Sequence, residues 1–295
     1  MSAGTFGQIV IGPPGSGKST YCQAMANYLR GIGRKVAIIN LDPANDNLGY
    51  EASANINQLI TQEDVMTSLH LGPNGALVYC MEFLEKNFEW LLEHVSRLRD
   101  HYLLFDLPGQ VELYTHHKSV KNLIEQMQKL GLHLCCVHLV DSHNCSDPGK
   151  FISALLLSLS TMLHIELPHL NVLSKVDLAA RYSGKLDFGL DFYTEVLDLN
   201  YLLDRLDSER GTSKLRKLNA ALVGLVEDYS LVSFLPLAVN DTQTLVKLQA
   251  AADKANGWVF GGSEPRNIQA LLACATGAEF EHERVGEIRD KYGGV

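Results

Sequence analysis

The sequence has no excess of positive charge, no paired cysteine motif, no internal repeat and no low-complexity tract. Its 295 residues include 25 Lys and Arg against 34 Asp and Glu, which gives a formal net charge of −9. This balance argues against a general binder of nucleic acids or anionic membranes, because both of those partners are themselves negative. An apolar content of 46% with 20% charged residues is typical of a folded soluble chain.

The six cysteines show no metal-site spacing, and Cys135 and Cys136 lie in an apolar, strand-like run. We therefore expect buried thiols and a reducing compartment. Residues 1–7 lack the basic and apolar regions of a signal sequence. The most apolar long stretch, residues 151–167, contains three serines and a histidine, so we expect a buried helix there rather than a membrane span. The sequence predicts a cytoplasmic protein, or one that shuttles between cytoplasm and nucleus.

Apolar runs alternate with helical patterns along most of the chain, which predicts an α/β fold. The sheet should be mostly parallel, with helices on both faces. The expected strands are residues 8–12, 35–40, 102–106, 134–141, 169–174 and 231–237, with a weaker one at 76–79. The expected helices are residues 21–29, 81–98, 111–130, 148–163, 212–228 and 242–256.

Residues 179–229 interrupt this alternation with polar helical stretches and no convincing strand. We interpret them as a helical insertion within one α/β domain at residues 1–265, not as a second domain. The turn-rich sequence at 261–265 ends that domain, and residues 266–295 are expected to form a partly mobile C-terminal tail.

The strongest motif follows the first expected strand, as Gly-Pro-Pro-Gly-Ser-Gly-Lys-Ser-Thr at residues 12–20. A strand, a G-x-x-x-x-G-K-[ST] loop and a helix form the context of a phosphate-binding P-loop, so we expect the α/β fold to be of the P-loop NTPase type. The loop amides and the positive end of the helix dipole would face one bound anion. Lys18 would bind the outer phosphates, and the Ser19 hydroxyl would coordinate Mg²⁺. The alternative is an ordinary glycine-rich turn. The residues expected to bind the nucleotide here are Gly15, Ser16, Gly17, Lys18, Ser19 and Thr20.

A second motif, Asp-Leu-Pro-Gly-Gln, begins at Asp106 at the end of an expected strand. Asp106 would hold Mg²⁺ beside the P-loop, the amide of Gly109 would approach a γ-phosphate, and Gln110 would reach a water near it. Without the P-loop, a strand that ends in a Pro-Gly turn would be the ordinary interpretation.

Two further carboxylates are candidates for the same site. Asp42 follows the second expected strand, and open α/β sheets bind ligands at the carboxyl edge, so it could join the metal shell or orient water. A turn aspartate before proline is the alternative. Glu112 could help to orient water, or it could simply favour a helix start through the dipole.

The sequence Ser-Lys-Val-Asp at residues 174–177 departs by one residue from the N-K-x-D pattern that reads guanine. Asp177 would accept hydrogen bonds from the guanine N1–H and amino group, which adenine does not present together, and Lys175 would pack along the base. Ser174 replaces the asparagine, and we expect it to lose one amide that braces the loop. A solvated charge pair is the alternative. Ala238, after the last strand, could offer its amide to the guanine O6.

These motifs, with Gly72-Pro73-Asn74, resemble the GPN-loop GTPases over roughly residues 6–260. Turn chemistry alone predicts a tight turn at 72–75. The resemblance implies a dimeric P-loop GTPase, with Asn74 at the dimeric nucleotide site. It also implies a role in the assembly and nuclear import of RNA polymerase II. The implied partners are GPN-loop paralogues, as a homo- or heterodimer, and RNA polymerase II subunits or assembly factors, without direct nucleic-acid or membrane contact.

We therefore expect a switch that binds and hydrolyses GTP with Mg²⁺ as cofactor. Its catalytic candidates are Asp42, Asn74, Gln110 and Glu112, and its metal ligands are Ser19, Asp106 and Asp42. No arginine finger is evident near the motifs, so intrinsic hydrolysis should be slow. Two alternatives stay open: a nucleotide-stabilised adaptor with little turnover, and a nucleotide kinase, whose P-loop is similar but whose lid usually carries several arginines.

Overall fold

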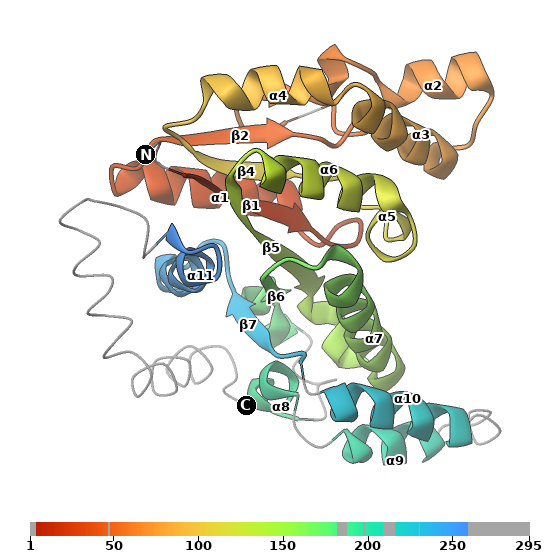
Figure 1. Cartoon of the computed structure of the whole chain (residues 1–295). Helices are drawn as coiled ribbons and strands as arrows, with labels where there is room; N and C mark the ends of the chain where they lie inside the picture. Colours follow the sequence, from red (N-terminus) through yellow and green to blue (C-terminus); the bar gives the residue numbers. More distant parts are fainter. Residues whose placement is uncertain are drawn as a thin grey trace.

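The computed structural model describes residues 4–46, 48–181, 188–196, 199–208, 216–229 and 231–258. Its centre is a seven-stranded sheet in the order β3-β2-β4-β1-β5-β6-β7, and all neighbouring strands are parallel (Figure 1). This confirms the predicted fold class. The strands are β1 (Thr5–Ile11), β2 (Val36–Asn40), β3 (Ala54–Asn55), β4 (Tyr102–Asp106), β5 (Leu132–Asp141), β6 (His169–Ser174) and β7 (Phe234–Leu237).

Helices fill most of the connections between the strands. They are α1 (Lys18–Gly31), α2 (Gln62–Leu69), α3 (Pro73–Lys86), α4 (Phe88–Arg97), α5 (Glu112–Thr115), α6 (Lys118–Lys129), α7 (Pro148–Ile165), α8 (Leu190–Glu195), α9 (Asn200–Ser208), α10 (Arg216–Tyr229) and α11 (Thr242–Ala255). Three short 3-10 helices, η1 (Ile56–Gln58), η2 (Ser142–Ser146) and η3 (Val176–Arg181), complete the described elements.

The central strands send alternate side chains to two separate apolar layers, as the pleat requires. On β1, Ile9 and Ile11 pack with residues of α3, α4, α5 and α6, whereas Val10 packs with α1 and α11. A third layer lies under α7, α8, α9 and α10 at the β5–β7 end of the sheet (Figure 1). Both faces are therefore covered, and ligands can reach the sheet only at its edges.

Four expected elements were wrong in type or extent. Residues 76–79, expected as a strand, lie in α3, because Ala76, Cys80 and Leu84 place their apolar side chains on one buried helical face. The Gly-Pro-Asn segment is not a tight turn: Gly72 caps α3 and Pro73 occupies its first turn, where proline loses no helical hydrogen bond. The single helix expected at 81–98 is interrupted at Asn87, between α3 and α4.

The helix expected at 111–130 is likewise two helices, α5 and α6, separated at His116 and His117. The two-residue strand β3 was not predicted from the sequence. It pairs only with the end of β2 and carries too few residues to show a strand pattern.

The helix α7 is long and apolar enough to cross a membrane by length and composition, with 44% of that window buried. Its buried residues, including Phe151, Leu155 and Leu159, join the apolar layer under α8, α9 and α10. That packing is the one expected of a core helix at this position.

The helices α8, α9 and α10 lie between β6 and β7, where the helical insertion was expected. Figure 1 shows α9 and α10 beside α7, at the end of the sheet away from α2 and α4. The C-terminal tail at 266–295 lies outside the described residues.

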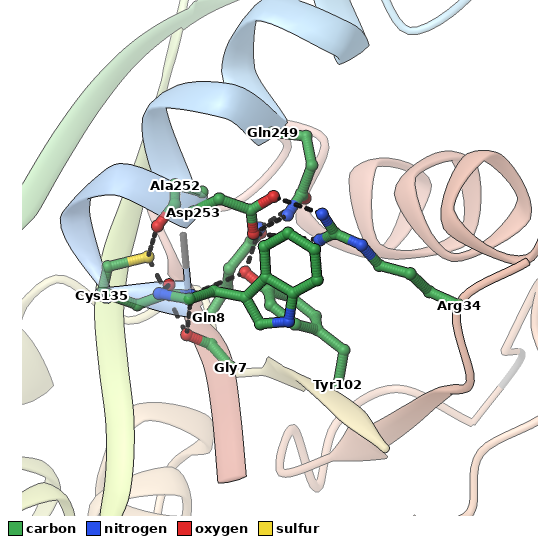
Figure 2. Close-up of polar contacts among 10 residues, drawn as sticks. Gly7, Gln8, Arg34, Tyr102, Cys135, Gln249, Ala252 and Asp253 are labelled. Carbon is green, nitrogen blue, oxygen red and sulfur yellow. Dashed lines mark hydrogen bonds and ion pairs between the residues drawn. The ribbon is translucent and has the colours of Figure 1, made fainter. Parts of the chain in front are cut away.

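A buried polar network holds α11 against the sheet (Figure 2). Gln8, on the strand that leads into the P-loop, donates to Gln249 Oε1 at 2.9 Å. Arg34 makes two hydrogen bonds to Asp253, at 2.6 and 3.0 Å, and its guanidinium lies 3.6 Å from the centre of the Trp258 ring. These contacts tie α11 to β1 and to the segment that follows α1, and β1 and α1 are the two elements that flank the P-loop.

Candidate active site

The loop after β1 has the backbone that a phosphate cradle requires. Gly15 and Gly17 have φ angles of +76° and +95°, a region that side chains with a Cβ rarely adopt, and Gly17 caps α1. A Cβ on Gly12 would lie 2.4 Å from the carbonyl oxygen of Leu139. The glycine pattern therefore reflects both unusual dihedral angles and close backbone approach, and it turns the amides toward one point at the start of α1.

Lys18 begins α1 and folds back over the loop. Its Nζ donates to Gly12 O at 3.1 Å and to Pro13 O at 3.3 Å, and the residue is 7% exposed. Burial lowers the pKa of Lys18, while the carboxylates of Asp106 and Asp42 act in the opposite direction. Within the described residues, the ammonium group donates hydrogen bonds only to carbonyl oxygens of its own loop, so a phosphate would compete for it with a full negative charge.

A cleft of about 790 Å³ opens above this loop. It is bounded by the P-loop, the loop after β2, the start of α3 and the turn after β4. The predicted site residues that line it are Gly15, Gly17, Lys18, Ser19, Thr20, Asp42, Asn74, Gln110, Glu112 and Lys175. The structure thus brings residues from four separate motifs to one hollow.

Asp106 lies fully buried at the end of β4, next to the cleft. Its Oδ2 accepts a hydrogen bond from Tyr50 OH at 2.7 Å, and its Oδ1 is buried with no hydrogen-bond partner among the described residues. Burial raises the pKa of Asp106, and the hydrogen bond from Tyr50, the nearby Ser19 hydroxyl and the charge of Lys18 act in the opposite direction. An unsatisfied carboxylate oxygen beside the Ser19 hydroxyl is the hard oxygen donor set that fits Mg²⁺.

Asp42 forms the turn that was one of its two interpretations, and its role toward a metal or a water stays a prediction. Its Oδ1 accepts a hydrogen bond from the Ala44 amide at 3.0 Å, which is the turn expected of an aspartate before proline. It also lines the cleft. Burial raises its pKa, opposed by the Ala44 amide and by the charge of Lys18.

The turn after Asp106 passes directly over the P-loop. A Cβ on Gly109 would lie 3.0 Å from Lys18 Nζ and 3.0 Å from Pro14 Cα, so the approach leaves little room for a larger residue. Gln110 is 9% exposed, and its Oε1 has no hydrogen-bond partner in the part of the chain that the structure describes. Glu112 is exposed on the cleft wall and is the first residue of α5, so both of its predicted roles stay open.

Asn74 lies at the exposed start of α3 and lines the cleft of its own chain, together with Leu77. The helical Gly-Pro-Asn segment therefore faces the P-loop without any second chain. Sequence alone left open whether Asn74 acts within one chain, and the structure shows that it can reach the cleft in this way.

Ser174 lacks the side-chain amide of an asparagine, as expected, but its hydroxyl supplies a brace of its own. Its buried Oγ lies 2.8 Å from Ser16 O and 3.1 Å from Val140 O, so one hydroxyl joins the end of β6 to β5 and to the P-loop. Lys175 adds a second link, because its Nζ donates to Gly15 O at 2.6 Å and pairs with Asp141 at 2.6 Å.

Ser16, Ser174, Asp177 and Ala238 do not line the cleft above the P-loop. Asp177 is half-buried in η3, directly after this brace. The amide of Ala238 donates to Thr244 Oγ1 at 3.2 Å, so it is already used within the turn after β7. The structure gives no support to Ala238 as a donor to a base, and the role of Asp177 stays a prediction.

Two residues of the site were missed from the sequence. Asn45 Nδ2 donates to Ser19 Oγ at 3.1 Å, and Tyr50 donates to Asp106. Both lie in the loop after Asp42, which the sequence placed at the correct edge of the sheet. Their individual contacts depend on how that loop folds back, and no local pattern encodes this.

Comparisons with known proteins agree with this geometry. A family model described as "Conserved hypothetical ATP binding protein" matches residues 10–258. GPN-loop GTPase 2 of Danio rerio is 54% identical over 287 residues, which cover 97% of this chain and 92% of that protein. GPN-loop GTPase QQT1 of Arabidopsis thaliana is 52% identical over 289 residues, 97% of both chains. A GTPase from Pyrococcus abyssi, solved in its apo form, has a TM-score of 0.67 and 25% identity, covering 86% of this chain and 98% of that one.

Proposed function

The chain belongs to the GPN-loop GTPase family and is a GTPase, and from this premise we propose that it is a Mg²⁺-dependent molecular switch that binds GTP over the P-loop. The observation that carries the proposal is the cleft itself. It gathers Lys18, Ser19, Asp42 and Gln110 around one hollow, with the free oxygen of Asp106 beside it.

The phosphates would be held by the amides of residues 15–20 and by Lys18, which would exchange the carbonyls of Gly12 and Pro13 for phosphate oxygens. Ser19 Oγ and Asp106 Oδ1 would hold Mg²⁺, with Asp42 as a further carboxylate facing the same hollow. When bound, the ion supplies positive charge against the β- and γ-phosphates.

Hydrolysis needs a water placed in line with the γ-phosphate. Gln110 offers an unpaired carbonyl oxygen that can accept a hydrogen bond from that water, and Asp42 or Glu112 could hold its second proton. Asn74 faces the cleft with an amide that can donate to phosphate or accept from water. Because the motifs carry no arginine finger, the chemical step should be slow unless one of these groups replaces its charge.

Base selection would depend on the loop after β6. Ser174 and Lys175 fix this loop to the P-loop. Asp177, two residues after Lys175, would accept the hydrogen bonds from guanine. The similar proteins are named as GTPases, whereas the family model is described by ATP binding, so the choice of base deserves a direct measurement.

The test compares hydrolysis of GTP and ATP by the wild type, Lys18→Ala and Lys129→Ala. Lys129 is an exposed lysine at the end of α6 and serves as the matched control. We expect GTP turnover above ATP turnover, loss of most of it in Lys18→Ala, and wild-type turnover in Lys129→Ala. Unchanged turnover in Lys18→Ala would overturn the assignment. Transfer of phosphate to added nucleoside monophosphates would favour the kinase alternative.

From the family resemblance we also propose a cytoplasmic protein, with transfer to the nucleus, that pairs with GPN-loop paralogues and acts in RNA polymerase II assembly. The exposed position of Asn74 at the cleft mouth supports a site that a second chain can cover. Pull-down of polymerase subunits with the GTP-bound and GDP-bound protein tests this role. Equal capture in both states would favour a nucleotide-stabilised adaptor over a switch.

A further inference from the structure

The loop between β2 and β3 contacts both residues that are expected to hold the metal. Asn45 Nδ2 donates to Ser19 Oγ at 3.1 Å, and Tyr50 OH donates to Asp106 Oδ2 at 2.7 Å. Both donors are uncharged and half-buried, and both come from one short segment. The two ligands are therefore held by the same loop, of which the proposed mechanism otherwise uses only Asp42.

The hydrogen bond from Tyr50 makes the two carboxylate oxygens of Asp106 different from each other. Oδ2 is occupied by the phenol, whereas Oδ1 is buried and lacks a partner within the described residues. A buried carboxylate oxygen without a partner is costly, so a site of this kind is stable mainly when a cation or a bound water completes it. The phenol also stops the carboxyl group from rotating, because rotation would break a 2.7 Å hydrogen bond.

Asn45 makes a similar hydrogen bond to the other expected metal ligand, Ser19. Its amide donates to Ser19 Oγ and so takes one of the two lone pairs of the hydroxyl oxygen, which leaves the second lone pair for a metal. The Ser19 oxygen is thus already held by the loop before any ion binds.

We propose that Tyr50 and Asn45 are positioning residues for the metal site: Tyr50 directs Asp106 Oδ1, and Asn45 directs the Ser19 hydroxyl, toward the same ion. The inference rests on the proposed function, because it presupposes that Ser19 and Asp106 hold Mg²⁺, directly or through one water. Hydrogen-bond partners of metal ligands typically change metal affinity by about 10–100-fold. The loop that carries Tyr50 and Asn45 would therefore set how tightly this GTPase holds its ion.

The experiment measures metal binding without relying on hydrolysis. The full-length protein is loaded with a fluorescent GDP, and the rate of nucleotide release is followed as free Mg²⁺ is varied with EDTA as buffer. Tyr50→Phe removes only one hydroxyl and keeps the ring. Tyr28→Phe makes the same change on α1, where Tyr28 packs against the apolar layer and does not line the cleft. Asn45→Ala tests the second ligand.

We expect the Mg²⁺ concentration at half-effect to rise by about 10–100-fold in Tyr50→Phe, and in the same direction in Asn45→Ala. Without Mg²⁺, release from both variants should match the wild type, and Tyr28→Phe should match it throughout. Wild-type half-effect concentrations in Tyr50→Phe and Asn45→Ala would overturn the proposal. So would release that is faster by the same factor with and without Mg²⁺, because the loop would then support the nucleotide rather than the metal.

A failure of the underlying metal site gives a different result. If Mg²⁺ does not slow release from the wild type, or if Asp106→Asn leaves the half-effect concentration unchanged, the site proposed for Mg²⁺ is wrong, and the positioning role fails with it. If Asp106→Asn shifts the concentration and Tyr50→Phe and Asn45→Ala do not, only the positioning role fails.

Discussion

Replacing Ser174 by alanine removes one hydroxyl and leaves the backbone and Cβ of the residue in place. Ser174 is 3% exposed, and its Oγ lies within hydrogen-bond distance of Ser16 O and Val140 O. The hydroxyl has one proton, so the substitution removes one hydrogen bond in total, shared between these two carbonyls. A buried neutral hydrogen bond contributes about 1 kcal/mol to stability, and leaving a buried carbonyl unpaired adds to the cost.

We therefore expect Ser174→Ala to lower the free energy of unfolding by roughly 1–2 kcal/mol. The same contact fixes the P-loop backbone, so part of the loss should appear in nucleotide binding. A loss of about 1 kcal/mol in binding corresponds to a roughly fivefold weaker Kd for GDP. Urea unfolding of the nucleotide-free protein measures the first quantity, and calorimetric titration with GDP measures the second.

Ser96→Ala is the matched control, because Ser96 is exposed on α4 and its hydroxyl bonds only within that helix, to Glu93 O at 2.8 Å. It should change neither quantity appreciably. If Ser174→Ala keeps wild-type GDP affinity while its stability falls, the hydroxyl supports the sheet but does not shape the P-loop. If neither quantity changes, the brace contributes nothing, and the reasoning about this position is wrong.

Three other substitutions test separate parts of the structure. Gly109→Ala adds a Cβ against the P-loop, so we expect kcat for GTP to fall roughly tenfold with GDP affinity nearly unchanged. A wild-type kcat would contradict the close approach of Gly109 to Lys18 and Pro14. Burial lowers the pKa of His138 from 6.5 to about 4, so the unfolded chain takes up a proton at a higher pH than the folded chain does. The contribution of neutral His138 to the free energy of unfolding should therefore be fully present above pH 6.5 and fall by up to about 3 kcal/mol toward pH 4. Urea titrations of His138→Gln should show a weaker dependence of stability on pH. Arg34→Met leaves Asp253 buried without its cation and should lower the free energy of unfolding by about 3 kcal/mol. The double variant Arg34→Met with Asp253→Leu should recover most of this loss. A single variant with wild-type stability would show that the ion pair does not hold α11.

Much of the fold could be predicted because its signals are local. The strands at 102–106 and 169–174 were predicted with their observed bounds, since continuous apolar runs between turn residues mark buried parallel strands. The P-loop was equally readable, because its glycines, lysine and serine lie within nine consecutive residues and their spacing fixes their geometry. The carboxyl edge of a parallel sheet then placed Asp42 and Asp106 near it.

The tertiary structure decided what depends on contacts between distant segments. The α3 helix replaced an expected strand because its apolar face meets α6 and the sheet, and that helix carries Asn74 to the cleft. Ser174 braces the P-loop across 158 positions of sequence, and the amide of Ala238 is taken by Thr244. Tyr50 reaches Asp106 only because a loop folds back over the sheet edge. A residue's local pattern fixes its backbone, but its hydrogen-bond partners are set by the packing of the whole chain, and a linear motif does not contain them.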